Sequence, residues 1–274
     1  MHKNINNCEL CGSDSIKVDF FLPSFKGLNN DFISKCNSCN FIFKARPYAN
    51  QINLSQGDYY SSKKIGSIVN NRFKKHFTKR SKQHYKYIKK FISNQPKTAL
   101  DIGCGAGFFI KELIVNNWDA IGLEPDPIMY DYALENSLNV KKVTFTDFNP
   151  NKKFGLIYLS HVLDDMPYIN KTIKKINSLL TSGGLLFIEV PNYSWNYRLN
   201  FTKEEDIIIG KYFFSNQTLK SVVINNGFEM INQFSFESIH TNTTLQKITS
   251  PFKLLSKLKP SIMKSYLRGI YKKI

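Results

Sequence analysis

The stretch KTALDIGCGAGFFIKEL, Lys97 to Leu113, decides the fold. Thr98 to Ile102 has the composition of a buried strand, and the residues from Phe108 onward have that of a helix. Between them, Gly103, Gly105 and Gly107 form a loop in which the backbone can approach a ligand closely. A strand, a glycine loop and a helix in this order predict an α/β sheet with a ligand site at the end of its first strand.

Acidic residues near the loop indicate what kind of ligand binds. The glycines run G-x-G-x-G, which differs from the G-x-G-x-x-G of pyrophosphate-binding loops, and Asp101 precedes them where a carboxylate attracts a cationic amino group. Glu124 ends the next predicted strand in DAIGLEPD, about 20 residues beyond the loop, where an acid can accept two ribose hydroxyls. A third predicted strand, Val140 to Phe145, leads to Asp147 and Phe148, an acid and an apolar wall for an adenine.

Together these motifs resemble the class I S-adenosylmethionine-dependent methyltransferases, from about Thr98 to Gln246. FGLIYLSHVLDDMP (154–167) looks like the fourth strand and turn of that family, and GGLLFIEVPN (183–192) looks like its fifth strand. YFFSNQTLKSVVINNGFEMI (212–231) is similar to its last helix and sixth strand. The resemblance implies an α/β fold with a doubly wound, Rossmann-like, seven-stranded sheet, and S-adenosylmethionine as cofactor.

Ligands of such sheets bind outside the carboxyl ends of the strands, which gives a set of expected cofactor contacts. They are Asp101, Gly103, Gly105, Glu124, Pro125, Asp147, Phe148, Ser160 and, from the segment before the basic helix, Tyr60. At the end of the fourth strand we expect His161 to act as a base, because its ordinary pKa near 6.5 suits proton abstraction near neutrality.

The acceptor is expected to meet the residues that follow the fourth and fifth strands. Asp165 is a second catalytic candidate, although relatives often carry a histidine there. It and Asp164 suit three roles: orienting His161, binding substrate or capping the next helix. Glu189 and Asn192, near the end of the fifth strand, are expected to contact a polyhydroxylated acceptor.

Four of the five cysteines form two Cys-x-x-Cys pairs, Cys8 with Cys11 and Cys36 with Cys39. Two such turns side by side complete a tetrahedral sulfur site for structural Zn²⁺, which predicts a small N-terminal zinc-ribbon module. Disulfides or redox dithiols are the alternatives. Neither a secretion signal nor a thioredoxin-like unit accompanies the cysteines. Cys104 is interpreted as a small filler in the glycine loop.

The net charge of +17 comes from two segments that contain no acidic residue. The first, Lys63 to Lys90, lies in a predicted amphipathic helix, Ile65 to Ile92, whose apolar face packs on the core or a second subunit. The second, Lys247 to Ile274, contains apolar residues at helical spacing from Leu254 to Ile274. They predict a basic amphipathic helix in the tail (251–274) that lies on an anionic membrane, forms a dimer arm or packs on the protein. The predicted organisation is a zinc module (1–50), a basic helical cap (51–95), the methyltransferase core (96–250) and the basic tail (251–274).

The resemblance favours methyl transfer to a small polar acceptor. A zinc-binding N-terminal region with EVPN after the fifth strand is similar to bacterial enzymes that act on sugar nucleotides or accompany surface-polysaccharide genes. The alternative is an RNA methyltransferase whose basic helix and zinc module bind phosphates. A third alternative is a non-catalytic binding protein that kept only the methyltransferase fold. The intact glycine loop and Glu124 disfavour it. We expect a cytoplasmic enzyme, peripheral to the inner membrane face if the tail binds lipid.

Overall fold

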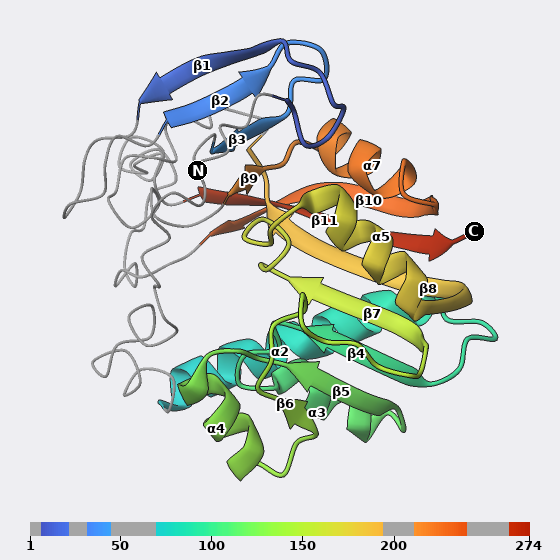
Figure 1. Ribbon diagram of the computed structural model, residues 1–274. Helices are drawn as coiled ribbons and strands as arrows, with labels where there is room; N and C mark the ends of the chain where they lie inside the picture. Colours follow the sequence, from blue (N-terminus) through green and yellow to red (C-terminus); the bar gives the residue numbers. More distant parts are fainter. Residues whose placement is uncertain (1–6, 22–31, 45–69, 194–210, 240–262) are drawn as a thin grey trace, which may run out of the picture.

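A computed structural model describes residues 7–21, 32–44, 70–193, 211–239 and 263–274 (Figure 1). Its main feature is a seven-stranded sheet in the order β10-β11-β8-β7-β4-β5-β6. The five strands from β8 to β6 are parallel, and β11 runs antiparallel to both of its neighbours. The predicted seven-stranded, doubly wound α/β fold is confirmed.

The elements of the large sheet and its helices follow in chain order. They are α2 (Asn71–Ile88), the 3-10 turn η1 (Lys89–Phe91), β4 (Thr98–Ile102), α3 (Phe108–Val115), β5 (Asp119–Leu123), α4 (Pro127–Glu135), β6 (Val140–Lys141), β7 (Phe154–Ser160), α5 (Ile169–Leu179), β8 (Leu180–Pro191), α7 (Asn216–Ile224), β10 (Phe228–Ile239) and β11 (Met263–Lys273).

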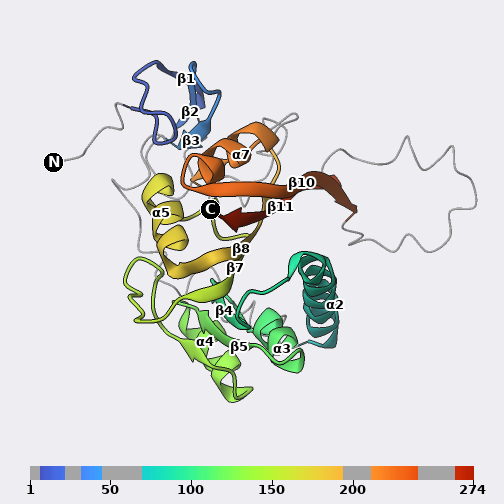
Figure 2. The same cartoon turned by 90° about the vertical axis from the view of Figure 1, so that its right-hand side faces the viewer.

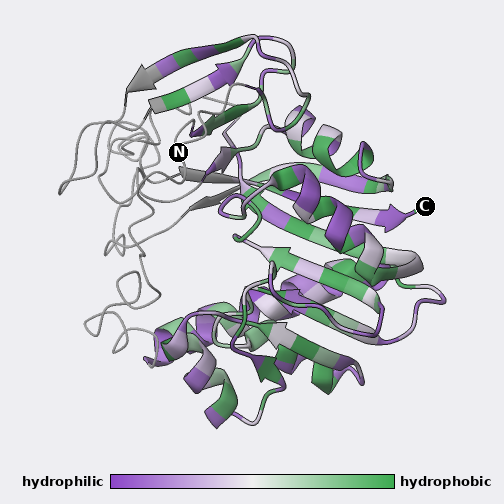
Figure 3. Cartoon of the chain, viewed as in Figure 1, coloured by the Kyte–Doolittle hydropathy of each residue, from purple (hydrophilic) through white to green (hydrophobic). Residues whose placement is uncertain are grey.

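Helices cover both faces of this sheet, with α2 and α3 on one side and α5 and α7 on the other (Figure 2). Side chains of a strand alternate between the faces. In β8, Leu186 and Ile188 enter the core beside α5 and α7, whereas Leu185 and Phe187 enter the core beside α2 and α3. The strands are accordingly hydrophobic along most of their length (Figure 3), as expected for a parallel sheet buried on both faces.

A second, four-stranded antiparallel sheet has the order β1-β2-β3-β9. Its strands are β1 (Ile16–Phe21), β2 (Phe32–Cys36), β3 (Ile42–Lys44) and β9 (Tyr212–Phe213). The first three come from the cysteine-containing segment, and β9 comes from the segment before α7. Phe41 stacks on Tyr212 with ring centroids 5.5 Å apart, so the N-terminal module shares a sheet and an aromatic core with the large domain.

The prediction of a C-terminal amphipathic helix over 251–274 is wrong for residues 263–274, the part of this range that the structure describes. Residues 263–273 form β11, inserted between β8 and β10, where Leu267, Ile270 and Tyr271 are fully buried. The sheet needs a strand at this position, and its ladder overrides the helical spacing of the apolar residues. The expectation of a membrane-binding tail depended on that helix.

Two further expectations need smaller corrections. The third parallel strand, predicted over Val140 to Phe145, is limited to two residues, and the chain then turns through Thr144 to Asp147. The basic helix begins at Asn71, capped by Asn70, and its apolar face packs on the core through Tyr85 and Ile88. Within the described residues, no helix is long and apolar enough to cross a membrane.

Candidate active site

The glycine loop and Glu124 form one structural unit at the carboxyl ends of β4 and β5. One carboxylate oxygen of Glu124 accepts a hydrogen bond from the Gly105 backbone N–H at 2.7 Å, and the other accepts from the Asp126 N–H at 2.9 Å. Gly105 has a left-handed φ of 53°, and a Cβ built there meets nothing within 4 Å. The loop is thus held by Glu124 and leaves open space above Gly105, which fits the expected cofactor.

Asp101 lies at the end of β4 with its side chain almost fully buried. Burial, with a smaller contribution from Glu124, raises its pKa well above the ordinary value. A bound cation would reverse that shift, because an opposite charge stabilises the carboxylate. This is the environment expected of a residue that pairs with the amino group of a ligand.

The turn after β7 packs directly against the same loop. Gly103 has a φ of 68°, and a Cβ there would lie 2.5 Å from Cγ2 of Val162. Because Val162 follows His161, this close packing sets the predicted base beside the cofactor loop. A larger residue at position 103 would displace that turn.

Residues expected on the adenine side are less closely tied to the site. Asp147 is exposed, and its carboxylate accepts a hydrogen bond from the Thr144 hydroxyl at 2.6 Å. The Phe148 ring is buried in the core beside α5, and Pro125 is half-buried before α4. Their contacts with the cofactor stay predictions, and Tyr60 lies outside the described residues.

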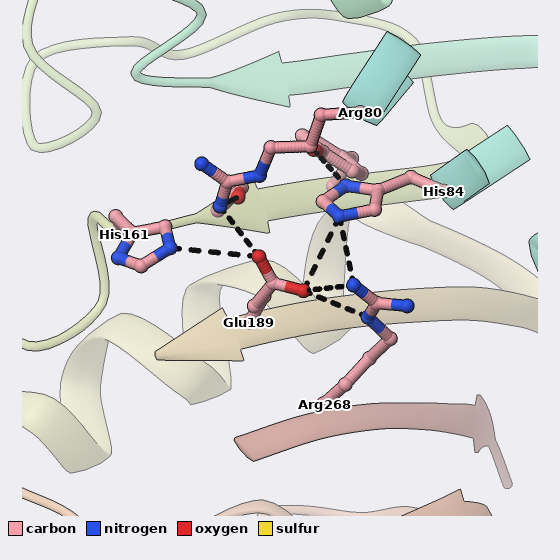
Figure 4. Close-up of polar contacts among 7 residues, drawn as sticks. Arg80, His84, His161, Glu189 and Arg268 are labelled. Carbon is pink, nitrogen blue, oxygen red and sulfur yellow. Dashed lines mark hydrogen bonds and ion pairs between the residues drawn. The ribbon is translucent and has the colours of Figure 1, made fainter. Parts of the chain in front are cut away.

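Glu189 is the centre of a buried ionic cluster (Figure 4). It pairs in register with Ser160 of β7 and Arg268 of β11, so three adjacent strands present polar side chains in one row. Nε and Nη2 of Arg268 lie 2.7 and 2.5 Å from one oxygen of Glu189. The pKa of Glu189 lies well below its ordinary value despite burial, through hydrogen bonds to His161 and His84 and the positive charge of Arg80.

Helix α2 completes the cluster from above the sheet. Arg80 and His84 are four residues apart and therefore lie on one helical face. Nη2 of Arg80 donates to the other oxygen of Glu189 at 2.5 Å and to the Ser160 hydroxyl at 2.8 Å. These two residues were absent from the predicted site, as was Arg268. The sequence signal that could have identified Arg80 and His84 is their i, i+4 spacing on the apolar face of a lysine-rich helix.

The placement of Glu189 changes its expected role. Its side chain is only 2% exposed, and both of its oxygens are bonded to other side chains, so it does not fit as an acceptor ligand. Instead it anchors His161, whose Nε2 lies 3.5 Å from one oxygen and whose backbone N–H donates to the Glu189 carbonyl at 2.8 Å. The imidazole of His161 is partly exposed and also packs edge-on against Tyr266.

The two acidic residues after His161 differ in exposure. Asp164 is buried, which raises its pKa, and its carbonyl accepts the backbone N–H groups of Lys211 and Tyr212. Asp165 is exposed on the same turn, and Asn192 is half-buried just after β8. A catalytic role for Asp165 and an acceptor contact for Asn192 stay predictions, and Glu189 is an acid that contacts His161.

His84 is held as a neutral imidazole. Its Nε2 lies 3.0 Å from Nη2 of Arg268, which only donates, and 3.2 Å from an oxygen of Glu189, which only accepts. Its Nδ1 shares a hydrogen bond with the Tyr158 hydroxyl at 2.6 Å. Burial is the main cause that lowers the pKa of His84 to about 4.

The environment of His84 predicts that the free energy of unfolding decreases as the pH falls. Between pH 6.5 and 4 the unfolded chain takes up a proton that folded His84 does not, so its contribution is complete above pH 6.5 and is lost as the pH falls toward 4. We expect the free energy of unfolding to decrease by about 2–3 kcal/mol from pH 7 to pH 4.5 through this group. Urea titrations of wild type and His84→Gln at both pH values test this. An equal decrease in both proteins would contradict it.

The four paired cysteines converge at the edge of the N-terminal sheet. Their sulfurs all lie within 4.8 Å of one another, and the Cys8–Cys39 and Cys11–Cys36 separations are each 3.6 Å. A tetrahedral Zn²⁺ with bonds of about 2.3 Å sets its sulfurs about 3.8 Å apart, so the geometry fits this ion. Gly12 and Asn40, which follow the two pairs, have left-handed φ values of 78° and 59°, a conformation that glycine and asparagine tolerate best.

We predict that the purified protein carries about one zinc per chain and that Cys36→Ser removes it. Loss of a structural metal is expected to cost about 4 kcal/mol or more of unfolding free energy. Elemental analysis and thermal unfolding measure the two effects. Cys104→Ser is the matched control, because that thiol lies outside the cluster, and it should retain the metal. Less than about half an equivalent in wild type would refute a zinc site.

Comparison with known proteins gives one family. A family model described as a methyltransferase domain matches residues 69–233, more than half of the chain. A solved S-adenosylmethionine-dependent methyltransferase from Archaeoglobus fulgidus is similar, with 22% identity and a TM-score of 0.53 over 72% of this chain and 94% of that one. A complex of the Haloferax volcanii Trm112 methyltransferase activator with a methyltransferase also matches, with 16% identity and a TM-score of 0.51 over 73% and 95%.

Proposed function

The chain belongs to the methyltransferase domain family and is an S-adenosylmethionine-dependent methyltransferase, and from this premise we propose that its acceptor is a sugar nucleotide or a glycan intermediate of surface-polysaccharide synthesis. The support for this acceptor is the likeness of the four-cysteine module and the EVPN segment, Glu189 to Asn192, to enzymes of that kind. Fold alone does not fix the substrate of a methyltransferase.

The cofactor, when bound, supplies a methyl group already activated on a sulfonium. In the proposed arrangement, Glu124 accepts the ribose hydroxyls with the lone pairs that remain after its bonds to Gly105 and Asp126. Asp101 pairs with the amino group. These contacts align the donor, which is the main task of the protein in an in-line displacement.

His161 receives the proton of an acceptor hydroxyl in this proposal. When Nε2 carries the hydrogen and faces Glu189, Nδ1 is the basic nitrogen. The buried carboxylate of Glu189 fixes this tautomer and stabilises the imidazolium formed after proton transfer, as an orienting acid does in other base-assisted sites. The single observation that carries the proposal is this His161–Glu189 pair beside the glycine loop.

The test is transfer of a labelled methyl group. Full-length protein is incubated with methyl-tritiated S-adenosylmethionine and a panel of nucleotide sugars, and label in the sugar fraction is counted. Label in a nucleotide sugar that disappears with Glu124→Gln supports the proposal. Label only in added RNA would contradict it.

RNA is a second candidate acceptor because α2 and η1 present exposed cations. They are Lys75, Lys79, Lys82, Lys86, Lys89 and Lys90. Binding through such cations depends strongly on salt, since it releases counterions from the nucleic acid. A steep loss of RNA affinity between about 50 and 200 mM salt would favour this candidate.

A further inference from the structure

The ionic cluster around Glu189 contains one more positive charge than its carboxylate needs. Arg268 contacts one oxygen of Glu189 through Nε and Nη2, at 2.7 and 2.5 Å, and Arg80 donates to the other oxygen at 2.5 Å. His84 adds no charge, because burial lowers its pKa to about 4. Arg80 therefore brings a second guanidinium to a site with one anion. Asp101 is the next acid on this side of the sheet, and in the proposed function it pairs with the amino group of the cofactor.

An uncompensated charge in a partly buried position is costly unless a ligand of opposite charge joins it. The side chain of Arg80 is 24% exposed, whereas Glu189 is 2% exposed. Water screens this charge only in part, and the carboxylate below it is closed to solvent. The exposed side of the cluster is thus cationic.

The guanidinium of Arg80 also has unused donors. Only Nη2 is bonded, to Ser160 and Glu189, and among the described residues Nη1 and Nε have no hydrogen-bond partner. Figure 4 shows the remaining terminal nitrogen turned away from Glu189, on the side of His161 and of the strand ends. The bond to Glu189 fixes the plane of the guanidinium, so its free donors are held in one direction.

We infer that Arg80 binds an anionic group of the acceptor, a carboxylate or a phosphate, and so sets the acceptor beside His161. A guanidinium offers parallel N–H donors that match the oxygens of either anion. Glu189 and Ser160 act as positioning residues for Arg80. The inference rests on the proposed function and narrows it to acceptors that carry a negative charge.

The test uses full-length protein saturated with S-adenosylhomocysteine and inorganic phosphate as the probe. Calorimetric titration at constant ionic strength is expected to show one phosphate per chain in wild type. Arg80→Gln should weaken this binding about tenfold or more, since charge-assisted hydrogen bonds are lost. Lys82→Gln is the matched control: it removes one charge from the exposed face of the same helix and should change the affinity less than twofold.

Arg80→Lys keeps the positive charge but lacks the paired donors, so it decides the question if Arg80→Gln does not fold. Weakening of about threefold or more is expected for it. Absence of both phosphate and acetate binding in wild type, or equal effects of the Arg80 variants and Lys82→Gln, would overturn the inference. A parallel titration with acetate distinguishes the two anions, because the tighter probe identifies the group that Arg80 takes.

Failure of this inference is separable from failure of the proposed function. Binding of S-adenosylhomocysteine is measured first in each protein. If wild type does not bind it, the proposed cofactor site fails. If wild type binds it without binding phosphate or acetate, and methyl transfer to a nucleotide sugar persists, only the role of Arg80 is wrong.

Discussion

Replacing Glu124 with glutamine is expected to weaken the binding of S-adenosylmethionine about 100-fold or more. The carboxylate would accept two ribose hydroxyls, and each hydrogen bond to a charged group is worth about 1.5–3 kcal/mol. Glutamine keeps an oxygen that can accept the Gly105 N–H, now 2.7 Å away, so the loop itself is expected to persist. The amide nitrogen of glutamine, however, donates hydrogen bonds where the second carboxylate oxygen of Glu124 accepts them, and the glutamine side chain carries no charge. Calorimetric titration with the cofactor measures the loss.

The matched control is Glu135→Gln, which neutralises an exposed acid at the end of α4. It should leave cofactor affinity unchanged. Thermal unfolding of both variants without cofactor separates a binding defect from a folding defect. If Glu124→Gln binds the cofactor within threefold of wild type, the ribose role of Glu124 is wrong.

The part of the site formed by Asp101, the glycine loop and Glu124 was predictable because it is local. Within about 25 residues a strand, a turn and a second strand follow one another, and parallel neighbours bring their carboxyl ends to one edge. The same holds for the cysteine pairs, whose short turns are specified by their own spacing. Gly12 and Asn40, directly after the two pairs, adopt a left-handed backbone that suits these residue types.

The last strand was not predictable from local pattern. Leu267, Ile270 and Tyr271 have helical spacing, and lysines separate the apolar residues of the tail. In the sheet, Leu267 and Tyr271 face one core and Ile270 faces the other, so both faces of β11 are buried. Such a strand has no two-residue alternation to recognise. Its identity as a strand comes from pairing with β8 and β10, which is tertiary information.

The ionic cluster was missed for a related reason. Arg80, Glu189 and Arg268 are far apart in sequence and meet only because β11 is inserted next to β8 and α2 lies over both. In the sequence, Arg80 is one cation among many in a basic segment, and Arg268 belongs to the tail for which the pattern predicts a helix. Glu189 alone was noticed, and as an isolated acid at a strand end it was assigned to the acceptor.

Replacing His161 with asparagine is expected to lower kcat for a hydroxyl acceptor by about 10²–10⁴-fold, the usual contribution of a general base. Asparagine is chosen because position 161 has a φ of 57°, a left-handed conformation that asparagine tolerates better than most residues. The backbone bond from residue 161 to the Glu189 carbonyl should then persist. The measurement is steady-state label transfer to the acceptor found in the nucleotide-sugar panel.

His76→Asn on the exposed face of α2 is the matched control and should retain wild-type kcat. Cofactor affinity of His161→Asn should also match wild type, because the imidazole acts on the acceptor. A base that acts in the chemical step lowers kcat, whereas a residue that only binds the acceptor raises KM with kcat unchanged. A rise in KM alone would therefore move His161 from proton transfer to acceptor binding. If kcat falls, Glu189 and His161 work as one unit in the chemical step, and a change at Glu189 in the His161→Asn background should lower kcat little further, while loss of Arg80 positioning would raise KM.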